Sequence, residues 1–326
     1  MPRVIKWGIL GLGKIAHKFT LDIKLVEDCQ LIAVASSSES RAKAFAKKYN
    51  ISEFYSDYQE LYINDDIDII YIASSNENHY IHTLEALKNK KAVLCEKPLA
   101  VNKNQVLNLI RFSQIHKVFL MEALWTRFNP TFGQLLEWIE KDKIGKLRYI
   151  NATFSFYGLN KEKDSRLFNP FKAGGSLLDI GIYPLFLAYK LLGTPNSLIS
   201  KAVKTTTGVD EQMALILTYD SSHALLYSSF SHEEDMRATI CGEKGEIYID
   251  SRWHESPIIT LIQKGKKTIQ KFNFLGKGYS YEIIEANNCL RNRLNESPKW
   301  TLQNSFDLVE LMDIARNQNG INFPIE

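Results

Sequence analysis

The chain has 326 residues, of which 45% are hydrophobic and 24% are charged, a composition that excludes a disordered or collagen-like protein. Its 40 lysine and arginine residues against 37 aspartate and glutamate residues give a net charge of +3, which is too balanced to indicate a nucleic-acid or membrane partner. A single core reaches its growth limit at about 250–300 residues, so we expect two domains.

The four cysteines lie far apart and form no C-x-x-C pair. They indicate reduced thiols, which are typical of a cytoplasmic protein, and no metal site. The amino terminus runs directly into a strand pattern without a cleavable leader, and no apolar stretch reaches the ~18 residues of a membrane-spanning helix. We therefore expect a cytoplasmic protein. The histidines form no ligand-spaced set, and we expect most of them at the surface or in loops.

The first 121 residues alternate short runs rich in Ile, Val and Leu with amphipathic segments at helical spacing. Such alternation predicts a parallel sheet covered by helices on both faces. The predicted strands are 4–10, 31–35, 67–73, 92–95 and 118–121. Asn102 and Gln105 form a capping pair that predicts the start of a helix. We expect a doubly wound α/β domain over residues 1–122.

From about residue 123, strand patterns follow one another with turn residues between them. Alternation over 213–219, a turn at 220–223 and a second strand at 224–230 predict a hairpin. The other predicted features are hairpins that reverse at 243–245 and 264–266, a strand at 147–156, and helices near 177–192 and 305–316. We expect residues 123–326 to form an α+β domain with an antiparallel or mixed sheet.

The first strand ends in the pattern G-x-G-x-x-A, formed by Gly11, Gly13 and Ala16, where strand turns to helix. Gly11 allows the tight turn, Gly13 lets the backbone approach a pyrophosphate, and Ala16 allows close packing of helix on strand. The phosphates would rest on the backbone of five consecutive residues, namely Gly11, Leu12, Gly13, Lys14 and Ile15. A glycine turn without a ligand is the alternative, but the motif opens a complete βαβ series, which favours dinucleotide binding.

The end of the second strand discriminates between the two dinucleotides. An acidic residue there hydrogen-bonds the ribose 2′-hydroxyl of NAD and repels the 2′-phosphate of NADP. This chain has Ser36, Ser37 and Ser38 instead, with Arg41 soon after, and hydroxyls and a guanidinium favour NADP over NAD. The alternative is that the serines only cap the helix that begins at Glu39 while Arg41 is solvated.

Polar residues follow two further strands, at the edge of a parallel sheet where ligands bind. Ser74, Asn76 and His79 follow the third predicted strand, and Glu96 and Lys97 follow the fourth. A lysine in that place could act near a nicotinamide ribose, and its alternative role is an ordinary ion pair with Glu96. The X-Pro bond that follows Lys97 is a candidate for the cis form.

Asp179 and Tyr183 lie in the most informative segment of the second half. Asp179 is the only charged residue between Leu177 and Ala188, and a carboxylate in apolar surroundings is costly unless it meets a cation or several donors. The two residues are four apart, so a helix would present both on one face toward one substrate. The alternative is an N-terminal charge on a buried helix together with a packing tyrosine.

Taken together, these motifs closely resemble those of the Gfo/Idh/MocA family of NAD(P)-dependent oxidoreductases, and the resemblance spans the full chain. It rests on the G-x-G-x-x-A start, on Glu96-Lys97-Pro98, and on Gly174-Gly175 followed by Asp179-x-Gly181-x-Tyr183. Within the family, segments 121–130 and 278–282 look most like the dimeric dihydrodiol dehydrogenases, which also oxidise D-xylose and related sugars.

The resemblance implies a Rossmann domain followed by an open-faced, mostly antiparallel sheet domain whose outer face often forms a dimer. It implies Lys97 and Tyr183 as the catalytic pair, with Asp179 beside them. It places four residues close to the cofactor, namely Asn76, His79, Glu96 and Arg127. It also implies an aromatic substrate pocket from Trp125, Phe154, Trp253 and Tyr279. Two positions depart from the family pattern, because Tyr183 stands where many members have His and Ser74-Ser75 replaces the usual Thr-Pro.

We therefore expect hydride transfer between NADP or NAD and a secondary alcohol of a sugar, polyol or cyclic trans-diol. Tyrosine titrates near ~10 in model compounds, and a neighbouring Lys97 ammonium would favour the phenolate of Tyr183 that takes the hydroxyl proton. Asp179 would orient the substrate or hold Lys97. We also expect a homodimer or higher homo-oligomer. Two alternatives stay open: a non-catalytic NADP-sensing interaction protein and an NAD-dependent glycosidase of the same family.

Overall fold

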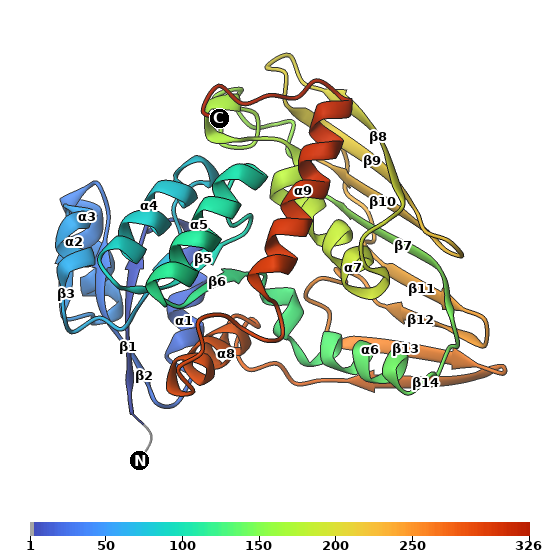
Figure 1. Cartoon of the computed structure of the whole chain (residues 1–326), viewed down its shortest axis with the longest axis horizontal. Coiled ribbons are helices and arrows are strands. Elements are labelled where there is room, and N and C mark those ends of the chain that lie inside the picture. The colour runs from blue at the N-terminus through green and yellow to red at the C-terminus, as the bar shows by residue number, and fades with distance from the viewer. Residues whose placement is uncertain (1–2) are drawn as a thin grey trace. The chain divides into compact units, whose positions relative to one another are not determined.

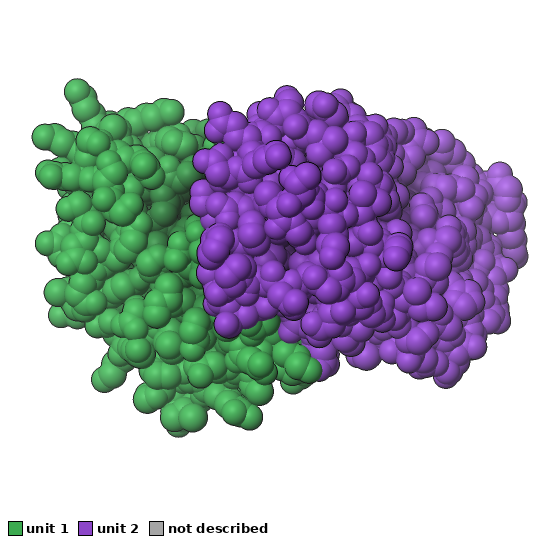
Figure 2. Space-filling model, turned by 90° about the horizontal axis from the view of Figure 1, so that it is seen from above, with its two compact units in different colours: residues 1–128, 274–306 green, residues 129–273, 307–326 purple. Residues whose placement is uncertain are grey.

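The computed structural model describes residues 3–326, and the chain divides into two compact units (Figure 2). Unit 1 comprises the chain up to Phe128 together with Phe274–Phe306, and unit 2 comprises Asn129–Asn273 and Asp307–Glu326. The boundary that we expected after residue 122 therefore falls after Phe128. In a second difference, the segment 274–306, which we expected in the carboxy-terminal domain, belongs to unit 1.

Unit 1 is built on a parallel sheet of six strands in the order β3-β2-β1-β4-β5-β6, with helices on both faces (Figure 1). This order, with β1 beside β4 at the centre, confirms the prediction of a doubly wound Rossmann sheet. The strands are β1 (Ile5–Leu10), β2 (Cys29–Ala35), β3 (Glu53–Tyr55), β4 (Ile69–Ile72), β5 (Ala92–Glu96) and β6 (Leu120–Ala123). The helices are α1 (Lys14–Ile23), α2 (Glu39–Tyr49), α3 (Tyr58–Ile63), α4 (Asn76–Lys88), α5 (Lys103–His116), a 3₁₀ turn (Trp125–Phe128) and α8 (Ser280–Arg291).

Buried polar contacts explain why the late segment joins unit 1. The carboxylate of Asp22, on α1, accepts hydrogen bonds from the backbone N–H groups of Lys277, Tyr279 and Ser280 at 2.9–3.2 Å. The indole N–H of Trp7, on β1, donates to the side-chain oxygen of Asn287 at 3.0 Å. Because a buried carboxylate and a buried indole each need such partners, α8 is held against the first sheet.

Unit 2 contains a mixed sheet of eight strands in the order β14-β13-β12-β11-β7-β10-β9-β8. The β7–β10 pair is parallel and every other pair is antiparallel, so the prediction of a mostly antiparallel sheet is confirmed. The strands are β7 (Leu147–Ser155), β8 (Ser197–Lys204), β9 (Asp210–Thr218), β10 (His223–Ser229), β11 (Ala238–Gly242), β12 (Gly245–Ile249), β13 (Ile258–Gln263) and β14 (Lys266–Lys271).

Helices cover one face of this second sheet, and the other face carries none in the described chain (Figure 1). They are α6 (Pro130–Glu140), a 3₁₀ turn (Pro170–Lys172), a π-helical turn (Leu177–Gly181), α7 (Ile182–Leu192) and the later part of α9 (Leu302–Gln318). The segment Pro170–Leu192 is long and apolar enough by mean hydropathy to cross a membrane, although charged residues interrupt its apolar stretches, and 83% of its most apolar window is buried. Its helical elements form part of the core of unit 2.

Candidate active site

The turn after β1 has the shape that a dinucleotide pyrophosphate requires. Gly11 has a φ of +89°, and a Cβ there would lie 2.7 Å from the backbone carbonyl of Ala73, so only glycine fits. A Cβ on Gly13 would meet nothing within 4 Å. Gly13 is also the N-cap of α1 and offers no side-chain cap, and the first turn of α1 holds no acidic residue. The first N–H groups of α1 are therefore open to an anion, as the motif predicted.

The serines after β2 divide between two roles. Ser38 is the N-cap of α2, and its hydroxyl accepts a hydrogen bond from the backbone N–H of Arg41 at 3.4 Å. The capping alternative therefore holds for this serine. Ser36 is buried, whereas the side chains of Ser37 and Arg41 are exposed. No carboxylate stands between the end of β2 and Ser38, so the feature that selects NAD is missing.

His79 connects the end of β4 to the turn that carries Lys97. Its imidazole is fully buried, with Nδ1 2.8 Å from the carbonyl oxygen of Pro98 and Nε2 3.1 Å from that of Ser74. Burial, with a smaller effect of the Lys97 charge, lowers the pKa of His79 to about 4. A neutral imidazole has one N–H to donate, so His79 can donate a hydrogen bond to only one of these two carbonyl oxygens at a time. The Lys97–Pro98 bond is cis, which confirms that expectation.

Glu96 is a buried carboxylate that accepts hydrogen bonds from a tyrosine hydroxyl and from a backbone N–H. Its Oε1 accepts a hydrogen bond from the hydroxyl of Tyr71, and its Oε2 accepts one from the backbone N–H of Lys97 at 3.3 Å. Burial raises the pKa of Glu96. A second buried carboxyl, Glu282, makes no hydrogen bond within residues 3–326, and burial together with the Glu96 charge raises its pKa well above the ordinary value.

Two of the expected pocket aromatics stack on each other within unit 1. The rings of Trp125 and Tyr279 have centroids 4.8 Å apart and planes inclined by 28°. Arg127, which we expected near the cofactor, donates from Nε to the carbonyl oxygen of Lys299 at 3.0 Å. Asn76 is the first residue of α4, beside the end of β4. The Trp125–Tyr279 stack and the residues after β4 therefore all belong to unit 1.

In unit 2, Asp179 and Tyr183 lie on two consecutive helical elements rather than on one α-helix. Asp179 is part of the π-helical turn, and Tyr183 is the second residue of α7. A π-helical turn inside a helix is rare and often marks a functional site. The carboxylate of Asp179 is partly buried, with 13% of its side chain exposed, and it is paired with the exposed Arg166, whose Nη1 lies 2.9 Å from Oδ1.

The π-helical turn is anchored from below by a second carboxylate. Oδ2 of Asp210, on β9, accepts hydrogen bonds from the hydroxyl of Ser176 at 2.7 Å and from the backbone N–H of Leu177 at 2.6 Å. Asp210 is fully buried, and this burial raises its pKa to about 6. The carboxylate therefore fixes the backbone from which Asp179 and Tyr183 project.

An aromatic cluster surrounds Tyr183 in unit 2. The imidazole of His254 stacks on the ring of Phe154, with centroids 4.1 Å apart, and both rings lie 5.5 Å from the ring of Tyr183. The exposed fraction of the Tyr183 side chain is only 6%. Trp253, the other expected pocket residue, is tied to the sheet because its indole N–H donates to the carbonyl of Thr153 at 2.9 Å.

Several residues of this site were not predicted from the sequence. His254 is buried at 3% exposure, whereas most of the seven histidines are partly or fully exposed, as expected. The other buried histidine, His79, was predicted beside the cofactor. Arg166 and Asp210 were not singled out. The alternation over 213–217 gave no signal for Asp210, because position 210 is out of phase with the buried Met213, Leu215 and Leu217, and the register of β8 against β9 shifts beside it. Lys97 is described in unit 1 and Tyr183 in unit 2, and their joint action stays a prediction.

Two family models match the chain in succession. Residues 5–123 match the oxidoreductase family with an NAD-binding Rossmann fold, and residues 132–248 match the GFO/IDH/MocA C-terminal domain. The chain belongs to the Gfo/Idh/MocA family. Its relatives include a trans-1,2-dihydrobenzene-1,2-diol dehydrogenase from Xenopus tropicalis, 37% identical over 98% of this chain and 99% of that protein. The same enzyme from Mus musculus is 33% identical over 98% of each chain.

Solved structures share the fold of this Gfo/Idh/MocA protein. A 3-ketoreductase from Actinomadura kijaniata, in complex with NADP and TDP-benzene, has a TM-score of 0.86 at 22% identity and covers 96% of this chain and 97% of its own. An aldose-aldose oxidoreductase from Caulobacter crescentus has a TM-score of 0.88 at 21% identity and covers 98% of each chain. The predicted family, the fold and the class of NAD(P)-dependent dehydrogenase are thereby confirmed.

Proposed function

We propose that the chain is an NADP-dependent dehydrogenase that oxidises a secondary alcohol of a cyclic trans-diol or a sugar. This substrate class is supported by dihydrodiol dehydrogenases that are 31–37% identical to the chain over nearly its full length. The observation that carries the proposal is the buried phenol of Tyr183, which stands against two aromatic rings just after the turn that holds Asp179. A phenol hydroxyl held in place by two neighbouring rings can exchange a proton with a substrate oxygen.

The residues present in unit 1 fit the cofactor. The uncapped start of α1 and the open space over Gly13 suit a pyrophosphate, and the exposed Ser37 and Arg41 suit a 2′-phosphate. When bound, the dinucleotide supplies the acceptor for the hydride. Ser74, Asn76 and His79 form or border the loop after β4, at the carboxyl edge of the sheet where such ligands bind.

The protein's own residues have to accept and return the proton of the substrate hydroxyl. Oxidation of the alcohol removes a hydride from the carbinol carbon and a proton from its oxygen, and in our proposal Tyr183 takes that proton and returns it in the reverse direction. Lys97 is proposed to favour the phenolate and to hold the nicotinamide ribose. Asp179, whose charge is offset by Arg166, is proposed to accept a hydrogen bond from the substrate hydroxyl.

A coupled assay tests this function. The purified protein is incubated with NADP or NAD and a panel of cyclic trans-diols, sugars and polyols, and formation of the reduced nicotinamide is followed by absorbance. We expect NADP reduction with trans-diols or sugars. If no alcohol in the panel reduces either dinucleotide, and no matching ketone oxidises NADPH, the proposed function is wrong.

We further propose that two copies associate through the outer face of the second sheet. Ile199, Ile216 and Leu225 are neighbours on β8, β9 and β10, and their exposed fractions are 61%, 44% and 38%. A continuous apolar row across three strands is unusual at a free surface.

We also propose a cytoplasmic location. The four cysteines are free, which supports a reducing setting.

A further inference from the structure

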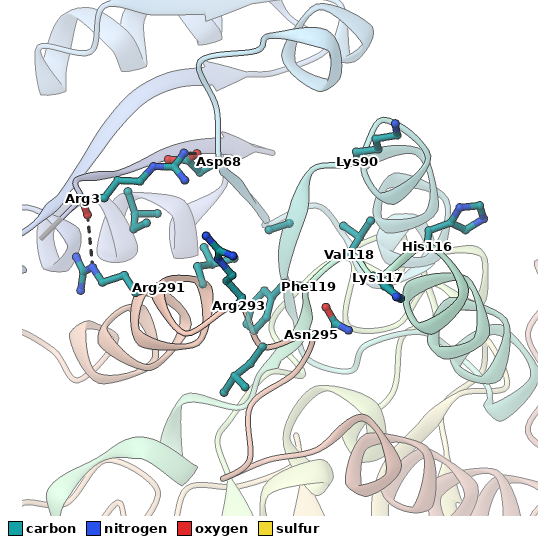
Figure 3. A pocket seen from close by; sticks show the side chains of 14 residues that line it. Arg3, Asp68, Lys90, His116, Lys117, Val118, Phe119, Arg291, Arg293 and Asn295 are labelled. Carbon is teal, nitrogen blue, oxygen red and sulfur yellow. Dashed lines mark hydrogen bonds and ion pairs between the residues drawn. The ribbon is translucent and has the colours of Figure 1, made fainter.

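A basic groove of about 810 Å³ lies in unit 1 (Figure 3). Its floor is formed where the parallel strands begin, whereas the Gly11 turn follows the end of β1. The apolar floor residues are Ile5, Ala92, Val118 and Phe119, and Leu290 and Leu294 of the α8 segment border them. A concave site of this volume with an apolar floor has the size of a small-molecule site.

Five lysine and arginine side chains and only one carboxylate line this groove. The carboxylate, Asp68, is paired with Arg3. Arg291 is engaged too, because its Nη2 donates to the carbonyl oxygen of Asp28 at 2.9 Å. The remaining three are Lys90, Lys117 and Arg293, whose side chains make no hydrogen bond or ion pair anywhere in residues 3–326. Figure 3 shows Arg293 between the arginines and the two lysines.

These three cations occupy unusual backbone positions. Lys90, Lys117 and Arg293 have φ values of 59°, 54° and 54°, and each follows the carboxyl end of a helix, where glycine is the favoured residue. One role of a cation there is to offset the helix dipole. The five cations of the groove face the carboxylate of Asp68 and three helix carboxyl ends, each of which carries about half a negative charge. The groove therefore keeps a net charge of roughly +2.5.

We propose that this groove binds a small organic diphosphate or triphosphate. Its phosphates contact Lys90, Lys117 and Arg293, and its ring rests on the floor around Phe119. Ammonium and guanidinium groups are the usual phosphate partners in proteins. Because the groove and the Gly11 turn lie at opposite ends of the strands, this ligand and the dinucleotide bind at the same time.

Binding of ADP to the NADPH-saturated protein, measured by calorimetry, tests the proposal. The dinucleotide site is filled in this experiment, so ADP reports on the groove. The test variant combines Lys90→Gly, Lys117→Gly and Arg293→Gly, which removes the charges while glycine keeps the left-handed backbone. Its matched control is Lys264→Gly, which replaces an exposed lysine of φ 50° in the turn between β13 and β14.

We expect saturable binding of ADP, unchanged in Lys264→Gly and weakened at least ~10-fold in the triple variant. Inorganic pyrophosphate, which lacks the ring, is expected to bind more weakly than ADP. The proposal is overturned if ADP does not bind the NADPH-saturated protein, or if the triple variant binds ADP as tightly as the parent. Equal affinity for pyrophosphate and ADP would overturn the role of the apolar floor.

Discussion

The carboxylate of Asp210 occupies the space that a side chain on Gly175 would need. A Cβ on Gly175 would lie 2.2 Å from Oδ1 of Asp210, and Gly175 has a φ of +118°. The same carboxylate bonds the next two residues, Ser176 and Leu177. The second glycine of the Gly-Gly motif thus allows a buried anchor to reach the turn that carries Asp179.

Gly175→Ala tests this relationship. We expect the free energy of unfolding to fall by about 2–4 kcal/mol, because backbone strain and a clash with a buried carboxylate add. Gly208→Ala is the matched control, since Gly208 has a φ of +95° but its Cβ would meet nothing within 4 Å. In that variant, backbone strain alone should lower the free energy of unfolding by only about 1 kcal/mol. Equal losses in the two variants, measured by urea unfolding, would show that Asp210 does not constrain position 175.

The pH dependence of the free energy of unfolding tests the raised pKa of Asp210. Burial raises its pKa to about 6 from an ordinary value of 3.8. The folded protein therefore holds this proton more tightly than the unfolded chain, and the stabilisation is complete below the ordinary carboxyl pKa and lost as pH rises through about 6. Asp210→Asn does not titrate. From pH 4 to pH 7 the parent should lose up to about 3 kcal/mol relative to this variant, and a constant difference would refute the shift.

Cofactor selection should depend on Arg41. We expect Arg41→Ala to weaken NADPH binding by ~10-fold and to leave NADH binding unchanged, because only NADPH carries a 2′-phosphate for the guanidinium. Lys43→Ala, which removes an exposed cation from the same helix, controls for a general loss of positive charge. Fluorescence titration of the reduced dinucleotides measures both constants. A parallel loss for NADPH and NADH would contradict the proposed contact.

Association through the second sheet should depend on its apolar row. Ile216→Asp places a charge between Ile199 and Leu225, and we expect it to convert a dimer into monomers because burying an unpaired carboxylate is costly. Ile115→Asp, at a 75% exposed position on α5, should leave the mass unchanged. Size-exclusion chromatography with light scattering measures the molar mass of the parent and of both variants. A parent that is monomeric, or an Ile216→Asp variant that keeps the parent's mass, would exclude this interface.

Local patterns were sufficient for the elements that carry the cofactor. The apolar runs at β1, β2, β4, β5 and β6 were each predicted within a few residues, and the Asn102 cap bonds the N–H of Gln105 as expected. β3 was missed because it has only three residues, Glu53–Tyr55, without alternation. The fit of Gly11 against Ala73 likewise follows from a motif with a defined backbone requirement.

Contacts between distant segments could not be predicted in this way. The place of α8 in unit 1 depends on Asp22 and Asn287, which lie more than 250 residues from their partners. The apolar sequence around Asp179 predicted a cation for its carboxylate, but nothing local distinguished Arg166 from other arginines. His254 reaches Phe154 only because β7 and the segment after β12 belong to one sheet domain.

The turnover of Tyr183→Phe tests the central claim most directly. The variant keeps the ring that packs on Phe154 and His254 and removes only the hydroxyl, so we expect kcat to fall by ~10³-fold while the Kd for NADPH stays within about twofold. Lys97→Met should also lose most turnover and still bind NADPH. Tyr189→Phe, on the same helix, removes a hydroxyl that donates to Asp307 and should retain the parent's kcat. A Tyr183→Phe enzyme that turns over at the parent's rate would contradict the account.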